Sequence, residues 1–245
     1  MIPVLARAKE KFEKRFDCRI YRHTLPHGVD CFKDIERRFG NGFFKVIFDV
    51  GANVGQSALE YTEKFPNAEI HSFEPVAANY QKLLEATGRN PKLHAYKLGM
   101  GERAGSVDIH VNQFSTTCSI KHGDPQAGLE SIELETLSGF MDKQNVSTVD
   151  FLKLDTEGYE LEVLAGAAKV LEEQRIHFLY IECEPVSTGR KFVSLEALGT
   201  LMNRFGYRPF GLYEQQTEWD GTNALRYINA VFICNKLQPA ASKAR

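Results

Sequence analysis

The sequence predicts a doubly wound α/β domain whose mostly parallel sheet ends in a C-terminal antiparallel hairpin. From residue 44 onward, short apolar runs alternate with amphipathic helical segments, and the last two apolar runs follow each other without a helix between them. Alternation of strand and helix forces right-handed crossovers between parallel strands, whereas neighbouring strands without a crossover pair antiparallel. The 245 residues, 43% apolar and 25% charged, suit one soluble domain of this kind.

An N-terminal arm at residues 1–43 precedes the main domain, which we expect at 44–236 with a tail at 237–245. Residues 4–16 place Leu5, Ala8, Phe12 and Phe16 at helical spacing among basic side chains. This pattern predicts an amphipathic helix, either packed on the domain edge or lying on a membrane surface. A short strand or hairpin is expected at 18–23 and a helix at 32–39.

In the main domain, strands are expected where apolar runs are bounded by turn residues: 44–50, 69–73, 93–98, 105–111, 132–137, 149–154, 177–181, 207–212 and 227–234. Helices are expected where apolar residues recur at helical spacing: 56–65, 77–87, 138–145, 159–173 and 195–205. The polar segment 112–131 is long for a connection inside a compact domain, which indicates a functional loop.

The composition excludes several classes of protein. Thirty basic and 32 acidic residues give a net charge of −2, so we expect no nucleic-acid partner, because such domains usually carry a basic excess. The five cysteines are widely spaced without a C-x-x-C pair, which indicates reduced thiols. No apolar run approaches the ~20 residues of a membrane span, and no signal peptide is evident, so we expect a cytoplasmic protein without stable membrane insertion. The oligomeric state stays open.

Two strand ends predict a nucleoside site. Gly51 and Gly55 follow the first strand, and glycines there let the backbone turn tightly and approach a ligand. Glu74 ends the second strand, 23 residues after Gly51, where a carboxylate can accept two hydrogen bonds from a ribose diol.

The first loop favours a particular nucleoside. A dinucleotide site needs a middle glycine, and Asn53 occupies that position, while Asp49 at the loop entrance would repel a pyrophosphate. The same carboxylate would attract an ammonium group. A ribose at one end and an ammonium at the other describe S-adenosylmethionine, the cofactor that we expect.

Three ordered blocks resemble the signature of FkbM-type methyltransferases: residues 46–56 (VIFDVGANVGQ), 73–75 (FEP) and 151–166 (FLKLDTEGYELEVLAG). With the flanking strands, the resemblance covers residues 44–235. It implies a Rossmann-like class I methyltransferase fold, S-adenosylmethionine as donor, and O-methylation of a sugar, glycolipid or polyketide hydroxyl. It places Asp49, Gly51, Asn53 and Gly55 along the methionine part of the donor and Glu74 on the ribose. It also places a turn containing Gly99 and Met100 beside adenine.

Asp155 and Glu157 follow the strand at 149–154 and are the leading candidates for the base that accepts the proton of the acceptor hydroxyl, with Asp155 preferred. Asp155 or Thr156 could instead cap the following helix, and Glu157 could complement its dipole. His122, in the loop 112–131, is a further candidate base, with a solvated loop histidine as the alternative.

Other side chains leave further possibilities open. Asp155, Glu182 and Glu184 could hold Mg²⁺, although the preferred interpretation has no metal. Lys153, in a buried strand, is either paired with a carboxylate or a desolvated base. The loop 213–226, with Tyr213, Trp219 and Asp220, could stack a sugar or pack on itself.

The sequence therefore predicts an S-adenosylmethionine-dependent O-methyltransferase acting on a hydroxyl of a small molecule or glycan. Two alternatives remain at this point. One is a non-catalytic S-adenosylmethionine-binding module. The other is a nicotinamide-dependent oxidoreductase of the same fold, which the missing middle glycine disfavours.

Overall fold

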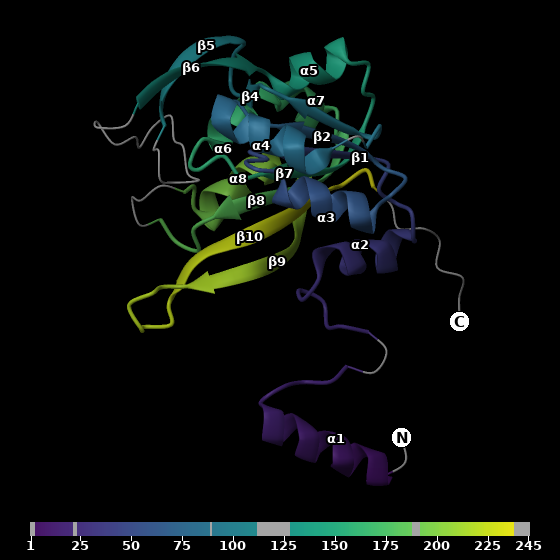
Figure 1. Ribbon diagram of the computed structural model, residues 1–245. Helices are drawn as coiled ribbons and strands as arrows, with labels where there is room; N and C mark the ends of the chain where they lie inside the picture. Colours follow the sequence, from purple (N-terminus) through teal and green to yellow (C-terminus); the bar gives the residue numbers. More distant parts are fainter. Residues whose placement is uncertain (1–2, 22–23, 89, 112–127, 188–191, 238–245) are drawn as a thin grey trace.

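The computed structural model describes residues 3–21, 24–88, 90–111, 128–187 and 192–237 (Figure 1). In chain order, the elements of the first half are α1 (Pro3–Phe16), α2 (Cys31–Phe39), β1 (Val46–Val50), α3 (Gln56–Lys64), β2 (Glu69–Phe73), α4 (Ala77–Thr87), β3 (Leu93–Tyr96), β4 (Gly99–Met100) and β5 (Gly105–Val111). Those of the second half are β6 (Gly128–Glu135), α5 (Leu137–Lys143), β7 (Val149–Leu154), α6 (Glu160–Gly166), α7 (Ala168–Glu172), β8 (Ile176–Cys183), α8 (Leu195–Arg204), β9 (Tyr207–Thr217) and β10 (Leu225–Cys234).

A seven-stranded sheet in the order β3-β2-β1-β7-β8-β10-β9 forms the centre of the molecule. The pairs from β3 to β8 are parallel, and β10 pairs antiparallel with both β8 and β9. The order reverses between β1 and β7, so a crevice opens at their carboxyl ends, where sheets of this class bind ligands. The predicted fold class and the C-terminal antiparallel hairpin are confirmed.

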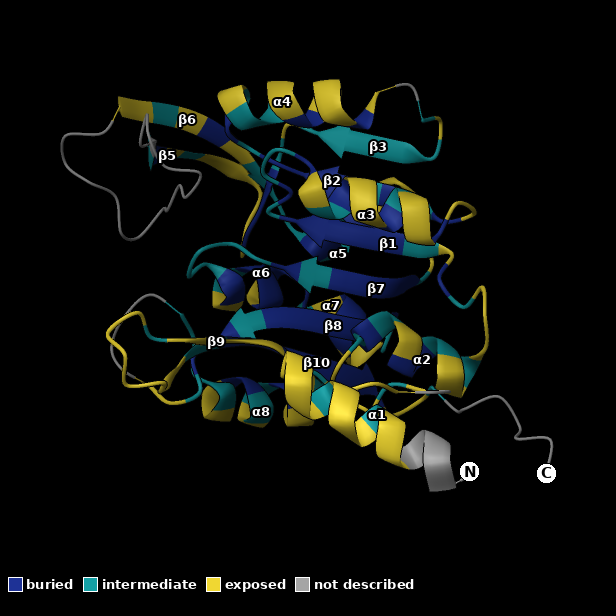
Figure 2. Cartoon of the chain, turned by 60° about the horizontal axis from the view of Figure 1, so that its bottom comes forward, coloured by how far each residue is buried: buried dark blue, intermediate teal, exposed yellow. Residues whose placement is uncertain are grey.

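Helices cover both faces of the sheet, which explains why its central strands are apolar along their length. On one face, α5, α6, α7 and α8 pack over a cluster that includes Phe48, Leu152 and Leu179. On the other face, α2 and α3 pack over Ile47, Phe151 and Phe178. Figure 2 shows β1, β7 and β8 buried along most of their length between helices whose outer sides are exposed.

A second sheet, in the order β4-β6-β5, was not predicted as a separate unit. The strand expected at 93–98 ends at Tyr96, and the expected turn at Gly99 and Met100 is instead a short strand that pairs with β6. Val76, Ile109 and Ile132 form a small apolar cluster under this sheet. Its strands therefore extend one end of the main sheet and supply an apolar wall beside the carboxyl end of β2.

Two further predictions about local structure were wrong. The helix expected at 159–173 is divided into α6 and α7. Gly166 ends α6, and a Cβ added to it would lie 2.0 Å from the carbonyl oxygen of Gly101. The strand expected at 18–23 is not formed in its described part, residues 18–21.

In the N-terminal arm, α1 lies apart from the sheets, and its Phe12 and Phe16 are exposed (Figure 1). By contrast, Cys31 and Ile35 of α2 belong to the core. No helix in the described part of the chain combines the length and the apolar character that a membrane crossing requires.

Gly51, directly after β1, is the tightest point of the fold near the crevice. Its φ is +84°, and a Cβ added to it would lie 1.9 Å from the carbonyl oxygen of Asp155. We therefore expect Gly51→Ala to lower the free energy of unfolding in urea by more than about 3 kcal/mol, because steric overlap adds to the left-handed strain.

Gly221 provides a matched control because its φ is +82° and a Cβ there would meet nothing within 4 Å. Gly221→Ala should lower the free energy of unfolding by only about 1–2 kcal/mol, the strain of a left-handed backbone at a residue with a Cβ. Equal losses for the two variants would show that the contact between Gly51 and Asp155 does not constrain the fold.

Candidate active site

The loop between β1 and α3 is tied to the end of β2 by its backbone. The amides of Gly51 and Ala52 both donate to the carbonyl of Phe73 at 3.0 Å. Asn53 has a left-handed φ of +50°, and its amide donates to Glu74 Oε2 at 2.9 Å. The glycine-rich loop and the acidic residue one strand away therefore form one connected unit, as their spacing predicted.

Glu74 is a buried carboxylate, with 5% of the residue exposed. Its second oxygen, Oε1, accepts from the amide of Val76 at 2.9 Å. Burial raises the pKa of Glu74 to about 7, although the hydrogen bonds from the amides of Val76 and Asn53 oppose the shift. Further hydrogen-bond donors from a ligand would stabilise the ionised form of this buried carboxylate.

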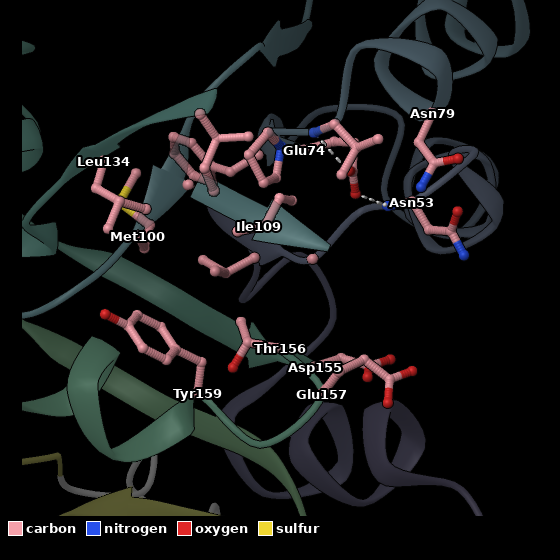
Figure 3. Close-up of a pocket in the computed structure, with 17 residues that line it drawn as sticks. Asn53, Glu74, Asn79, Met100, Ile109, Leu134, Asp155, Thr156, Glu157 and Tyr159 are labelled. Atoms are coloured by element: carbon pink, nitrogen blue, oxygen red, sulfur yellow. Dashed lines mark hydrogen bonds between the residues drawn. The ribbon is translucent and has the colours of Figure 1, made fainter. Parts of the chain in front are cut away.

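Glu74 lies on one side of a pocket at the carboxyl ends of β1, β2 and β7. The open space in it, its mouth included, is about 780 Å³. Figure 3 shows Asn53, Glu74 and Asn79 on one side, Asp155, Thr156 and Glu157 on the other, and Met100, Leu134 and Tyr159 along the wall between them.

The acidic side of the pocket is the loop between β7 and α6. Glu160, 1% exposed, accepts through Oε1 from the Thr156 hydroxyl and from the amides of Thr156 and Gly158. The helix begins after Tyr159 without a side-chain cap, so neither Asp155 nor Thr156 is its cap. The capping alternative for Asp155 is therefore wrong, and Glu160 organises this loop instead. Glu157 has a left-handed φ of +57°, a conformation that concentrates at functional sites.

Lys153 lies within the buried sheet and pairs with two carboxylates. Its Nζ is 2.9 Å from Asp155 Oδ2 and 3.7 Å from Asp49 Oδ1. Although burial opposes the charge, the carboxylates of Asp49 and Asp155 raise the pKa of the Lys153 ammonium. Lys153 is therefore a charged partner of carboxylates rather than a neutral base, which decides between the two interpretations of its sequence position.

Most of the predicted site residues come together. Those that line the pocket are Gly51, Asn53, Glu74, Gly99, Met100, Asp155 and Glu157. Asp49 and Gly55 are not among the residues that line it. His122 lies outside the described residues, so its role as a base stays a prediction.

Asp49 lies outside the pocket because side chains along a strand alternate between the two faces of the sheet. It is fully buried on the face of the sheet that also carries Ile47, opposite to the face of Val50. The placement does not support direct contact between Asp49 and a ligand ammonium. Burial raises the pKa of Asp49, although Lys153 opposes the shift.

Gly55 serves the packing of two helices instead. It has a φ of +95° at the start of α3, and a Cβ there would lie 3.0 Å from Leu83 of α4.

Several pocket residues were not identified from the sequence: Asn79, Ile109, Ile132, Leu134, Thr156 and Tyr159. Ile132 and Leu134 alternate with polar residues in β6, which indicates a strand with one apolar face but not the surface that this face covers. Asn79 follows Glu74 in the first turn of α4, and this proximity was the available signal for a polar residue beside the carboxylate.

The magnesium alternative receives no support from the described part of the chain. No group of three or more His, Cys, Asp or Glu side chains there is arranged to hold a metal ion. Asp155, Glu182 and Glu184 do not form such a group, and Asp155 is paired with Lys153.

The segment 213–226 spans the end of β9, the tip of the hairpin and the start of β10. Tyr213 is buried, and its hydroxyl donates to Asp34 Oδ2 at 3.0 Å. Trp219 is 86% exposed and stacks on the guanidinium of Arg226, which lies 3.9 Å from the ring centroid. The tip of this hairpin therefore packs partly on itself, which was the alternative interpretation.

A solved structure with the same fold is the FkbM methyltransferase from Methylobacillus flagellatus. The two align with a TM-score of 0.53 at 19% sequence identity, over 80% of this chain and 46% of that one. At this identity, the likeness concerns the fold alone.

Curated relatives are similar over about half of the chain. The 2-O-methyltransferase NoeI of Sinorhizobium fredii is 24% identical over 153 residues, which are 56% of this chain and 62% of that protein. The hexuronic acid methyltransferase AglP of Haloferax volcanii is 28% identical over 141 residues, 56% of this chain and 55% of that protein. The chain thus spans less than two thirds of the length of either relative.

The family comparison covers the site itself. Residues 49–209, about two thirds of the chain, match the family model described as the methyltransferase FkbM domain. This range contains the glycine-rich loop, Glu74 and the Asp155 loop. The chain therefore belongs to the FkbM methyltransferase domain family.

Proposed function

We propose that this protein is an S-adenosylmethionine-dependent O-methyltransferase that acts on a hydroxyl of a sugar or glycosylated small molecule. The proposal rests chiefly on one observation: a buried carboxylate, Glu74, and an acidic loop, Asp155 to Glu157, face each other across one pocket with an apolar wall. These three features correspond to the ribose, the cationic methionine end and the adenine of the donor.

The residues present fit this donor. Glu74 would accept hydrogen bonds from the ribose hydroxyls, and Asn53 and Asn79 lie beside it. Met100, Ile109 and Leu134 offer an apolar surface for adenine. Gly51 keeps the backbone free of a side chain between the two sides, and the acidic loop favours a positively charged group.

When bound, S-adenosylmethionine supplies a methyl group already activated by its positive sulfur. The protein must then hold the acceptor oxygen close to the methyl carbon and in line with the carbon–sulfur bond. A donor held here would give its methyl group to the acceptor oxygen, and its sulfur would keep the electron pair of the broken carbon–sulfur bond. Asp155, whose side chain is 38% exposed toward the pocket, takes the hydroxyl proton, and Lys153 orients this carboxylate through their 2.9 Å ion pair.

The relatives support the reaction and the acceptor class. One is named as a 2-O-methyltransferase and the other as a methyltransferase of hexuronic acid. O-methylation of a sugar hydroxyl suits a site that offers a carboxylate as base.

Asp155→Asn tests the catalytic assignment. We expect kcat for transfer of a labelled methyl group to a panel of methyl glycosides to fall by about 10²–10⁴-fold, because the base is lost. Binding of S-adenosylhomocysteine, measured by calorimetry, should change less than threefold, because Glu74, the apolar wall and Glu157 of the acidic loop remain.

Two variants complete this experiment. Asp108→Asn, at an exposed residue of β5 that does not line the pocket, should leave both quantities unchanged. A larger loss of kcat in Glu157→Gln than in Asp155→Asn would transfer the role of base to Glu157. Binding without transfer to any glycoside by the wild type would favour the non-catalytic binding module.

Glu74 predicts how donor binding depends on pH. Its pKa of about 7 in the free protein means that the carboxyl is protonated below this pH, whereas a ribose diol requires the ionised acceptor. The affinity for the donor should therefore be greatest above pH 7 and should fall about tenfold for each pH unit below 7. The measurement is calorimetry with 5′-methylthioadenosine between pH 5 and 8, because this compound lacks the titrating amino acid.

Glu74→Gln provides the control for this titration. It should bind 5′-methylthioadenosine at least tenfold more weakly than the wild type at pH 8, with an affinity that no longer changes with pH. An affinity of the wild type that is constant from pH 5 to 8 would contradict the placement of the ribose at Glu74.

A further inference from the structure

A second cavity lies on the opposite face of the sheet from the apolar wall of the first. Its open space, mouth included, is about 710 Å³. Strands β7, β8 and β9 contribute Lys153, Tyr180 and Glu214 to its lining. Helices α2 and α3 contribute Phe32 and Ser57. No role in the reaction has yet been given to this cavity.

The two cavities meet at one ion pair. Asp155 lines the first cavity, Lys153 lines the second, and Lys153 Nζ lies 2.9 Å from Asp155 Oδ2. A molecule in the second cavity that contacts Lys153 therefore lies one ion pair away from Asp155 and the donor pocket. This is the geometry that methyl transfer needs, because donor and acceptor enter from different sides and meet at the base.

A β-bulge directs Glu214 into the second cavity. Tyr213 pairs with Asn229 and Gln216 pairs with Tyr227, so Glu214 and Gln215 together oppose Ile228. Glu214 has a left-handed φ of +46°. Because of this bulge, Tyr213 and Glu214 both line the cavity, although neighbours in a regular strand face opposite sides.

Two neighbours hold the Glu214 carboxylate in place. The Tyr180 hydroxyl donates to Glu214 Oε2 at 2.5 Å, and Asn229 Nδ2 donates to the same oxygen at 3.0 Å. Tyr180 is 7% exposed and lies beside Lys153 in the register of β7 and β8. Glu214 itself is exposed, so an oriented carboxylate is presented to a ligand at the cavity wall.

The charges of the cavity select against an anionic ligand. Each lysine among the described lining residues already has a carboxylate partner: Lys64 pairs with Glu60 at 2.6 Å, and Lys153 pairs with Asp155. Asp30 pairs with Lys33 at 3.5 Å, so the Glu214 carboxylate leaves a negative balance. A ligand carboxylate would meet like charge, whereas hydroxyl or ammonium donors would find an acceptor.

We propose that this second cavity is the acceptor site, and that it takes an uncharged or amino-bearing sugar in preference to a sugar acid, with Glu214 as a residue that determines specificity. The inference rests on the proposed function. Hydroxyls of the sugar donate to Glu214, its ring lies among the aromatic side chains, and the hydroxyl to be methylated lies beside Asp155.

Direct binding tests the proposal without requiring turnover. Saturation-transfer NMR titrations would use methyl α-glucopyranoside, its 2-amino analogue and methyl α-glucuronide on protein saturated with S-adenosylhomocysteine. We expect the first two glycosides to bind at least tenfold more tightly than the glucuronide. Glu214→Gln should weaken them at least tenfold and reduce the discrimination against the glucuronide, because the charged acceptor is lost.

Two further variants separate the binding role from a structural one. Tyr180→Phe removes the hydroxyl that holds Glu214, and it should weaken the same two glycosides while leaving S-adenosylhomocysteine affinity within twofold. Glu218→Gln, a matched acid-to-amide change outside the cavity lining, should leave all affinities unchanged.

Each result has one meaning. Absence of glycoside binding, preference for the glucuronide, or binding unaffected by Glu214→Gln overturns the acceptor site, while the proposed function stands if S-adenosylhomocysteine binds. Failure of S-adenosylhomocysteine to bind the wild type overturns the proposed function, and the acceptor site with it.

Discussion

The charge of Lys153 is the constraint on which the arrangement of the site depends. An ammonium inside a buried sheet costs several kcal/mol in lost hydration unless carboxylates face it. Asp49 lies beside Lys153 in the register of β1 and β7, and Asp155 follows at the end of β7. The ion pair with Asp155 lies where the two cavities meet, so the interaction that makes a buried lysine tolerable also fixes the carboxylate proposed as the base.

Close backbone contacts hold the rest of the site to this ion pair. Gly51 approaches the carbonyl of Asp155, which joins the ends of β1 and β7, and Asn53 donates to Glu74, which joins β1 to β2. The two acidic sides of the donor pocket are therefore connected through one short loop. Such a pocket is largely preformed, because its polar groups are oriented by backbone contacts before a ligand enters.

Particular residues show how far sequence patterns lead. The glycine spacing after β1 and the acidic end of β2 pointed to Gly51, Asn53 and Glu74, and these residues line one pocket together with Asp155. The same reasoning placed Asp49 in that pocket, although alternation along β1 turns its side chain to the other face. Gly99 and Met100 line the pocket as expected, but in a strand rather than a turn.

Periodicity along the chain determined by itself the kinds of element, their order and the strand ends at which a ligand would bind, because these depend on neighbours in sequence. Only the tertiary structure decided which residues meet across strands: Lys153 beside Asp49 and Tyr180, Ile132 over the donor pocket, and Glu214 turned inward at a bulge. Strand register and bulges arise from packing between segments far apart in the chain, and no local pattern records that packing.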